Sequence, residues 1–183
     1  WQELEELFGD ENRIWVDYED IPEYAWQATV AIEDQRFFEH HGVDWRRTIH
    51  AVFNMFFGMR DTFGGSTITQ QVIKNLTEDN ETTVKRKVTE IFRALELEDN
   101  YSKEDILEVY LNKIYFGHTA YGIGAAARTY FGKEASELSL AECASIIAIT
   151  NNPSLYDPLS DRIISRDTGE RDENGDIIYE DWT

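Results

Sequence analysis

The segment EDQRFFEHHG, from Glu33 to Gly42, holds the first residues whose types and spacing could do chemistry. Glu33 follows the apolar helical stretch ATVAI, so its carboxylate is expected to be partly desolvated, as suits a general base. The simpler interpretation is that Glu33 and Asp34 begin a solvated helix face. His40 and His41 could bind a metal or act as a base, although a histidine near a helix end more often forms a structural hydrogen bond.

A second candidate lies in GGSTITQQVIKN, from Gly64 to Asn75. Two glycines followed by Ser and Thr at a helix start bring backbone N–H groups and hydroxyls together. This predicts an anion site, with Lys74 on the following helix. The spacing of a P-loop lysine is absent. The alternative is an N-capped helix with a polar face, although the adjacent amides of Gln70 and Gln71 are unusual for a face that is only solvated.

The third candidate, RKVTEIFRALELE from Arg86 to Glu98, places a carboxylate between two guanidiniums. Arg86, Glu90 and Arg93 fall at i, i+4 and i+7, so they share one side of a helix. A carboxylate in that position stays ionised, although a surface ion-pair ladder would show the same spacing. One carboxylate in an apolar setting and a second flanked by arginines suit sugar chemistry, in which one group manages a proton and the other stays charged.

The elements that must position these motifs are predicted to be helices. From Glu23 to His40 the chain has no helix breaker, and alanines recur at near-helical spacing, which predicts a buried helix that ends near Gly42. Apolar periodicity and polar runs predict further helices over residues 46–57, 66–75, 84–95, 102–114 and 139–149.

Capping boxes at Ser102–Asp105 and Ser139–Glu142 mark two of these helix starts. The second box opens a helix whose small and apolar residues, Ala144 to Ile149, are expected to be buried all round. Strand signals are absent before residue 160, and the tail holds a weak hairpin pattern in which 162–165 and 177–182 flank a turn-rich stretch. We therefore predict an all-α domain with a short β-hairpin in the tail, for which a disordered acidic loop is the alternative.

The chain has 183 residues, with 36 acidic against 17 basic side chains and a formal charge of −19. That balance excludes a duplex nucleic-acid binder that works by bulk positive charge. The single cysteine, Cys143, excludes a disulfide framework and a zinc–thiolate cluster. No apolar run reaches the roughly 18–20 residues that span a bilayer, and no signal peptide is visible, so we expect a piece of a longer protein.

The acidic excess lies mostly in the two flanks of the chain. Residues 1–24 hold nine acids and one base, and residues 160–183 hold eight acids and three bases. The stretch 25–159 is closer to balance, with 19 acids and 13 bases. We therefore divide the chain into an acidic N-terminal segment (1–24), a central domain (25–159) and an acidic tail or hairpin insertion (160–183).

Five motifs, the three above followed by SKEDILEVYLNKIYFG and GIGAAARTYFGK, closely resemble the peptidoglycan glycosyltransferases of glycosyltransferase family 51. These are the polymerase domains of class A penicillin-binding proteins and the monofunctional enzymes. The resemblance covers roughly residues 25–159 and implies a lysozyme-like helical fold with a large lobe and a smaller, membrane-facing jaw lobe. The implied reaction transfers a growing glycan from its lipid pyrophosphate to the 4-hydroxyl of a second lipid II, with inversion to a β-1,4 bond.

The resemblance also implies roles for individual residues. Glu33 matches the general base that takes the proton from the acceptor hydroxyl, and Glu90 matches a second essential carboxylate that assists departure of the pyrophosphate, directly or through a metal ion. The jaw of the family implies that Phe53, Phe56 and Phe57 face the membrane, with core packing as the alternative. Other matching substrate-site residues are Asp34, Phe37, His40, Ser66, Gln70, Gln71, Lys74, Arg86 and Lys87. No tightly bound cofactor is expected, and a divalent cation, Mg²⁺ or Mn²⁺, near Glu90 is left open.

The chain departs from the family at two positions. Thr82 or Thr83 stands where members often carry an arginine, for which Lys85 could compensate, and Thr89 stands where some members carry a lysine. The implied partners are lipid II, the growing lipid-linked glycan and the membrane surface, with a covalent transpeptidase domain in the full-length protein and no nucleic acid. The implied location is the extracytoplasmic face of the bacterial cytoplasmic membrane, with this chain as a soluble fragment without its anchor.

Two other functions compete with glycan synthesis. A lysozyme-like muramidase or lytic transglycosylase would share the fold and cleave glycan, but GGSTITQQ and RKVTEI speak against it because a hydrolase holds no pyrophosphate. A catalytically silent module that binds cell-wall partners is the other alternative, and the retention of Glu33 and Glu90 argues against it.

Overall fold

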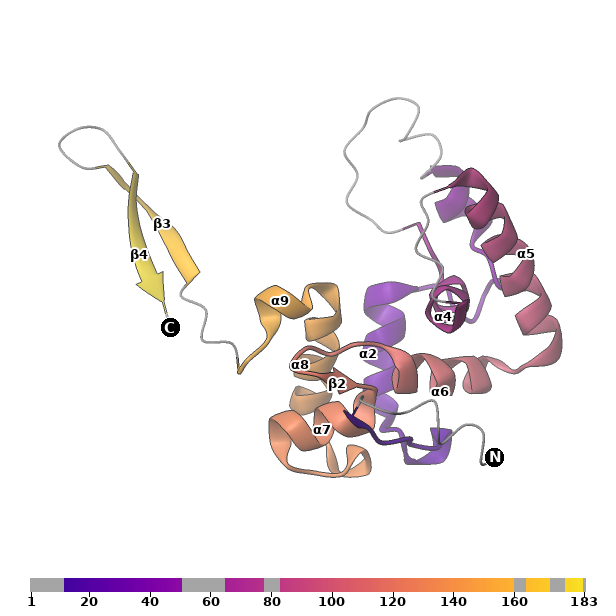
Figure 1. Ribbon diagram of the computed structural model, residues 1–183, viewed down its shortest axis with the longest axis horizontal. Coiled ribbons are helices and arrows are strands. Elements are labelled where there is room, and N and C mark those ends of the chain that lie inside the picture. The colour runs from indigo at the N-terminus through magenta and orange to yellow at the C-terminus, as the bar shows by residue number, and fades with distance from the viewer. Residues whose placement is uncertain (1–11, 51–64, 78–82, 160–163, 172–176, 183) are drawn as a thin grey trace.

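The computed structural model describes residues 12–50, 65–77, 83–159, 164–171 and 177–182. The helices that form the body in Figure 1 confirm the predicted all-α class. They are α2 (Glu23–Glu33), α4 (Ile68–Thr77), α5 (Val84–Asn100), α6 (Lys103–Lys113), α7 (Ile123–Phe131), α8 (Leu140–Asn151) and α9 (Pro153–Tyr156), with 3₁₀ turns η2 (Tyr18–Asp20) and η3 (Ala135–Glu137).

Helix α2 ends at Glu33, well before the end predicted near Gly42. Asp34 leaves the helix with φ −154°. Its side chain points inward and accepts hydrogen bonds from the Ile68 amide at 3.1 Å and from His40 Nε2 at 2.9 Å. The predicted helix to His40 is therefore wrong, because these buried tertiary hydrogen bonds hold Asp34 in a non-helical conformation, and residues 35–39 form turns.

Helices α2 and α8 pack against each other, and each buries only one face. On α2, Ala25 and Thr29 are buried, whereas Ile32 is half exposed. On α8 the buried positions include Ile146 and Ile147, whereas Ala144 and Ala148 are exposed, so the prediction of a helix buried all round is wrong. Small residues allow close packing on either side of a helix, and the sequence does not show that one side lacks a neighbour.

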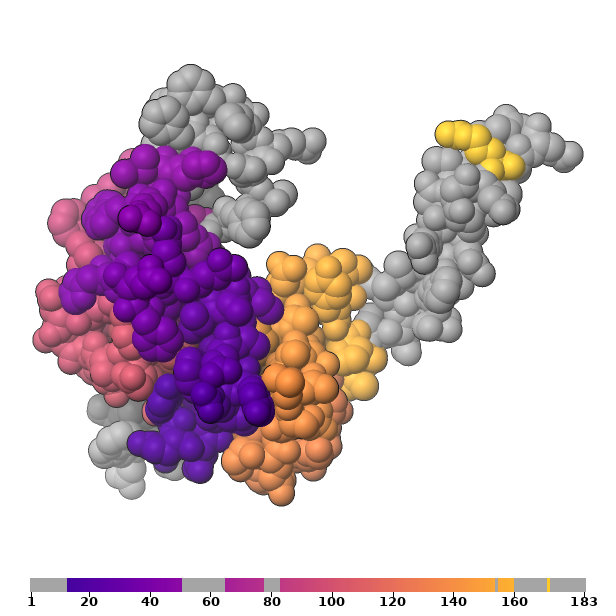
Figure 2. Space-filling model, turned by 180° about the vertical axis from the view of Figure 1, so that it is seen from behind, coloured from indigo at the N-terminus to yellow at the C-terminus, as the bar shows by residue number. Residues whose placement is uncertain are grey.

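The main core lies where α6, α7 and α8 meet α2. Figure 2 shows the N-terminal segments, in indigo and purple, lying against the orange surface of α7–α9. The largest fully buried side chains of this core are Tyr110, Phe37, Phe116, Ile68, Ile106, Leu107, Leu111, Ile123, Ile146 and Ile147. Two of them, Phe37 and Ile68, belong to the first two motifs, so the core helps to fix these motifs in position.

Helix α4 packs against both α5 and α6, and a small second core joins it to α5. That second core consists of Val43, Ile73 and Ala94. The apolar stripe predicted on α5 enters it only in part, because Val84 is 79% exposed and Phe92 is 67% exposed. In the part of the chain that the structure describes, α5 is thus covered on one side.

Both predicted capping boxes are present. The Ser102 hydroxyl accepts from the amide of Asp105, whose carboxylate accepts from the amide of Ser102. Ser139 and Glu142 form the same reciprocal pair at the start of α8. Each box satisfies two helix-end donors that would otherwise lack a partner.

Two short strands, β1 (Asn12–Arg13) and β2 (Ala120–Tyr121), pair in parallel. The prediction of no strand before residue 160 is wrong here, because two-residue strands are too short to show a periodicity. Near these strands, the side-chain amide of Asn112 forms hydrogen bonds with the backbone of Val16, as a neighbouring strand would. It accepts from the Val16 amide and donates to the Val16 carbonyl, both at 2.8 Å, which fastens the N-terminal segment to α6.

The C-terminal hairpin predicted from the sequence is present as β3 (Ile164–Arg171) and β4 (Ile177–Trp182). The strands are antiparallel, with Ile164 opposite Trp182 and a register shift between Asp167 and Arg171. Strand β3 extends beyond the predicted 162–165, because the polar residues of the supposed turn continue the ladder. In Figure 1 the hairpin stands apart from the helical body.

The described helices contain none that is long and apolar enough to cross a bilayer. The side chains predicted to face the membrane, Phe53, Phe56 and Phe57, lie outside the described residues.

Candidate active site

Glu33, the last residue of α2, turns its carboxylate toward α4. Gln71 Nε2 donates to Glu33 Oε2 at 2.8 Å, and Thr150 Oγ1 of α8 lies 3.4 Å from Oε1. Arg47 Nη1 donates to the backbone carbonyl of Glu33 at 2.8 Å and so fixes the main chain. The carboxylate is partly buried, and its close side-chain donor, the Gln71 amide, is uncharged, as suits a general base.

Asp34, the next residue, is fully buried and acts as a junction between the first two motifs. It accepts from His40 Nε2 at 2.9 Å, from the Ile68 amide at 3.1 Å and from Arg47 Nη1 at 3.4 Å. Because a carboxylate can only accept here, Nε2 of His40 carries the proton. Asp34 and His40 thus join the turn after α2 to the start of α4.

Backbone N–H groups at the start of α4 donate hydrogen bonds to acceptors of the protein itself. The Thr67 amide donates to Gln70 Oε1 at 3.0 Å, the Gln70 amide donates to Thr67 Oγ1 at 3.2 Å, and the Ile68 amide donates to Asp34. The sequence predicted an anion site made of such amides. At these three positions the prediction is not supported, because protein acceptors already occupy the donors.

Glu90 lies at the centre of a small cationic cluster and is only 5% exposed. Arg86 and Lys87 each pair with one of its oxygens, and Lys87 Nζ also donates to Ser66 Oγ at 2.8 Å. Two cations against one carboxylate leave one formal positive charge beside the Ser66 hydroxyl. The alternative of a surface ion-pair ladder is wrong, because the carboxylate is buried and because Lys87, rather than the exposed Arg93, is its second cation.

The two carboxylates flank the same part of α4. Gln71 contacts Glu33, whereas Ser66, just before the helix, contacts Lys87 of the Glu90 cluster. The stretch between them includes a single helical turn, which rises roughly 5 Å. The three motifs, distant in the sequence, therefore form one site.

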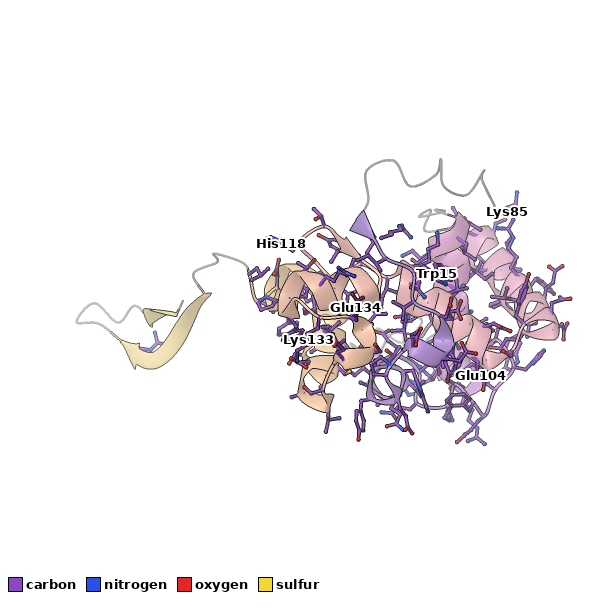
Figure 3. The ribbon with its side chains drawn as sticks, turned by 90° about the horizontal axis from the view of Figure 1, so that it is seen from below. Trp15, Lys85, Glu104, His118, Lys133 and Glu134 are labelled. Carbon is purple, nitrogen blue, oxygen red and sulfur yellow. The ribbon has the colours of Figure 1, made fainter. Side chains whose placement is uncertain are left out.

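The other predicted site residues fall into two groups. Phe37 and Gln70 are buried beside the site, where Lys103 Nζ lies 4.2 Å from the Phe37 ring centroid. Lys74 is exposed on the later part of α4, and Lys85 is exposed near the start of α5, where Figure 3 shows it at the edge of the molecule. Direct contact with a substrate stays a prediction for each of these residues.

Three of the buried polar side-chain atoms without a hydrogen bond belong to these motifs. They are His40 Nδ1, Gln70 Nε2 and Arg86 Nε, which lack a hydrogen bond among the described residues. Most buried polar atoms in proteins find a partner, so such exceptions call for a ligand or a water molecule.

Sequence reasoning missed three residues of the site, namely Arg47, Thr150 and Tyr110. The hydroxyl of Tyr110 lies 3.4 Å from Gln71 Oε1. Tyr110 was assigned to the apolar stripe of its helix, but a buried tyrosine usually needs a partner for its hydroxyl, and that signal could have singled it out. Arg47 and Thr150 carry no comparable signal, because only tertiary packing brings them to Glu33.

The predicted divalent cation remains a prediction. Within the described ranges, no group of three or more His, Cys, Asp or Glu side chains could hold a metal ion. Both oxygens of Glu90 already face cations, so the side chains there do not by themselves form a set that fits Mg²⁺ or Mn²⁺. No step below is therefore routed through a metal.

Comparison with known proteins identifies the family. A family model described as Transglycosylase matches residues 2–174. The chain is 49% identical over 148 residues to penicillin-binding protein 2D of Bacillus subtilis, which covers 81% of this chain and 21% of the relative. It is 43% identical over 166 residues to penicillin-binding protein 1A of Escherichia coli, which covers 90% of this chain and 20% of the relative.

Penicillin-binding protein 4 of Bacillus subtilis is 43% identical over 157 residues, which cover 85% of this chain and 25% of that protein. The chain thus spans about a fifth to a quarter of the length of these relatives. The match extends across all five motifs and confirms the family predicted from them. The chain belongs to the transglycosylase family, glycosyltransferase family 51, whose relatives here are penicillin-binding proteins.

Proposed function

We propose that this chain is a peptidoglycan glycosyltransferase, which polymerises lipid II into β-1,4-linked glycan with inversion at the donor anomeric carbon. One observation carries the proposal. Two carboxylates with opposite surroundings flank the start of α4. Glu33 is held by one uncharged side-chain donor, the Gln71 amide, and Glu90 is paired with two cations. Such a division of tasks suits a transfer in which a proton is taken on one side and an anion leaves on the other.

Glu33 acts as the general base in this proposal. As the acceptor 4-hydroxyl attacks the donor anomeric carbon, its oxygen forms the new glycosidic bond and its proton passes to the Glu33 carboxylate. Among the described residues, a close donor at 2.8 Å reaches Glu33 Oε2 but not Oε1, so Oε1 can reach the acceptor hydroxyl. The hydrogen bond from Arg47 to the Glu33 carbonyl keeps the base in place during this transfer.

The Glu90 cluster serves the leaving group. The bond between the anomeric carbon and the pyrophosphate oxygen breaks, and its electron pair departs with the undecaprenyl pyrophosphate. The net positive charge of Arg86, Lys87 and Glu90 stabilises the negative charge that grows on that oxygen. Glu90 assists by holding both cations in a fixed arrangement, so that little reorganisation is needed when the bond breaks.

The partners of the proposed activity are lipid II and the growing lipid-linked glycan at the outer face of the cytoplasmic membrane. The relatives bear the name penicillin-binding protein, which agrees with a transpeptidase domain elsewhere in the full-length protein. The side chains proposed to meet the membrane, Phe53, Phe56 and Phe57, lie outside the described residues.

The decisive experiment is a lipid II polymerisation assay on the wild-type chain, Glu33→Gln and a matched control, Glu39→Gln. Glu39 follows closely in the same motif and is exposed, so its substitution changes the net charge equally. We expect Glu33→Gln to lower the rate about 100-fold or more with an unchanged melting temperature, because general base catalysis contributes on that scale.

If Glu33→Gln polymerised lipid II at the wild-type rate, Glu33 would not be the general base. Loss of preformed glycan without any polymerisation by the wild-type chain would instead favour a glycan-cleaving enzyme, and no reaction with either substrate would favour a binding module.

A further inference from the structure

A buried tyrosine reaches the proposed base through one intermediate side chain. Tyr110 of α6 is 2% exposed, and its hydroxyl donates to Gln71 Oε1 at 3.4 Å. The other end of the same amide, Gln71 Nε2, donates to Glu33 Oε2 at 2.8 Å. Side chains from α6, α4 and α2 thus form a chain of hydrogen bonds that ends at the carboxylate.

The direction of the Gln71 amide decides whether it helps or hinders Glu33. With its NH₂ end toward Glu33, the amide donates to the carboxylate, whereas with its carbonyl end there, two acceptors would face each other. The hydroxyl of Tyr110 favours the first orientation. With the amide reversed, the hydroxyl could accept from the NH₂ end, but its own buried hydrogen would have no acceptor among the described residues. Burial and the charge of Glu33 raise the pKa of Tyr110, so its phenol keeps the proton that it donates.

The other oxygen of Glu33 is held less firmly. Thr150 Oγ1 lies 3.4 Å from Glu33 Oε1, but it has a single hydrogen and stands 2.7 Å from the Ile147 carbonyl within its own helix. The shorter contact takes the hydrogen. Glu33 is therefore anchored at Oε2 and leaves Oε1 as the oxygen that can accept a proton.

We infer that Tyr110 is a positioning residue, which orients the Gln71 amide so that it anchors Glu33 Oε2 and presents Oε1 to the acceptor hydroxyl. This inference rests on the proposed role of Glu33 as the base. Tyr110 touches neither substrate nor the reacting atoms and acts only through Gln71. Its removal should therefore slow the chemical step and leave substrate binding nearly unchanged.

The test compares Tyr110→Phe with Tyr130→Phe in steady-state lipid II polymerisation. Tyr130 is a matched control, because its hydroxyl also donates a hydrogen bond, to the Phe116 carbonyl at 2.8 Å, and neither Phe116 nor its other neighbour Asp157 belongs to the Glu33 site. We expect Tyr110→Phe to lower kcat about fivefold, the effect of one ordinary hydrogen bond, with KM unchanged. Tyr130→Phe should keep the wild-type kcat.

A double-mutant cycle with Gln71→Met separates positioning from a general loss of structure. Met has a similar length but no amide, so in the Gln71→Met background Tyr110→Phe should cause no further loss of kcat. The inference would be overturned if Tyr110→Phe lowered kcat equally in the wild-type and Gln71→Met backgrounds, or if Tyr110→Phe alone kept the wild-type kcat. A wild-type kcat for Gln71→Met would also overturn the inference, even if Tyr110→Phe does not fold, because Tyr110 acts only through Gln71.

A failure of the role inferred for Tyr110 can be distinguished from a failure of the proposed function. Full activity of Glu33→Gln would overturn both proposals. An inactive Glu33→Gln together with a fully active Tyr110→Phe would overturn only the role of Tyr110.

Discussion

The turn after α2 packs so closely on α5 that one added methyl group should disturb it. Gly42 has φ +69°, a left-handed conformation that residues with a Cβ rarely adopt. A Cβ built there would lie 2.5 Å from the Ala94 carbonyl oxygen and 3.0 Å from the Leu95 nitrogen. Both are backbone atoms of α5, which cannot rotate away, so Gly42→Ala must push the turn and the helix apart.

Gly132 offers a matched control for this substitution. Its φ is +64°, nearly the same, but a Cβ built there would meet no atom of the described residues within 4 Å. Gly132→Ala therefore carries only the cost of the left-handed backbone, about 1 kcal/mol. Gly42→Ala carries that cost and also the overpacking, about 1–3 kcal/mol more, and we expect a total of about 3 kcal/mol.

Thermal unfolding of the two variants and the wild-type chain measures the difference. For a chain of this size we expect Gly132→Ala to melt about 3 °C lower and Gly42→Ala about 10 °C lower. Equal losses in the two variants would refute the reasoning, because they would show that the close approach of Gly42 to α5 carries no energetic weight. The shift should also reach the site, because Thr67 Oγ1 donates to the Gly42 carbonyl at 2.7 Å.

Two further substitutions test the ion pairs that frame the site. Burial by itself would raise the pKa of Asp44, but hydrogen bonds from the Arg47 amide and the Arg36 side chain outweigh it and hold that pKa below its usual value. The stabilisation is therefore complete above about pH 4 and is lost as the pH falls through the lower, folded-state pKa. We expect Asp44→Asn to cost about 2 kcal/mol at pH 7, with a difference from wild type that shrinks below pH 4 in thermal unfolding. Lys103→Met should cost roughly 3 kcal/mol in urea unfolding, because it leaves the 2%-exposed carboxylate of Glu98 buried without its cation.

Each of these two substitutions has its own control. For Asp44→Asn the control is Asp17→Asn, at an exposed position, and a constant difference between Asp44→Asn and wild type from pH 7 to pH 2 would contradict the linkage. For Lys103→Met the control is the double variant with Glu98→Gln. It should recover part of the lost stability, and a single Lys103→Met as stable as wild type would show that the pair contributes nothing.

The acidic character of the whole chain does not conflict with the proposed anionic leaving group, because the charge at the site differs from the charge of the whole chain. The formal charge of the whole chain is −19, yet Arg86, Lys87 and Glu90 form a cluster with one net positive charge. Because opposite charges act most strongly at short range in a buried setting, the local cluster governs the site more than the distant acidic flanks do.

The sequence by itself determined the family, the helical class and the positions of the two carboxylates. Local patterns carry this information, because a capping box such as Ser102–Asp105 or the i, i+4 pair Arg86–Glu90 needs only residues that are close in the chain. The same patterns predicted the C-terminal hairpin, although not the full length of β3.

Only the tertiary structure decided how the motifs work together. It ended α2 at Glu33, because Asp34 takes its hydrogen bonds from residues of other elements. It showed that the second cation paired with Glu90 is Lys87 and not Arg93, which the helix spacing had predicted. It also brought Thr150 to Glu33 and Tyr110 to Gln71, contacts that join separate helices. Such contacts depend on how helices pack, and the spacing of residues within any one helix carries no record of them.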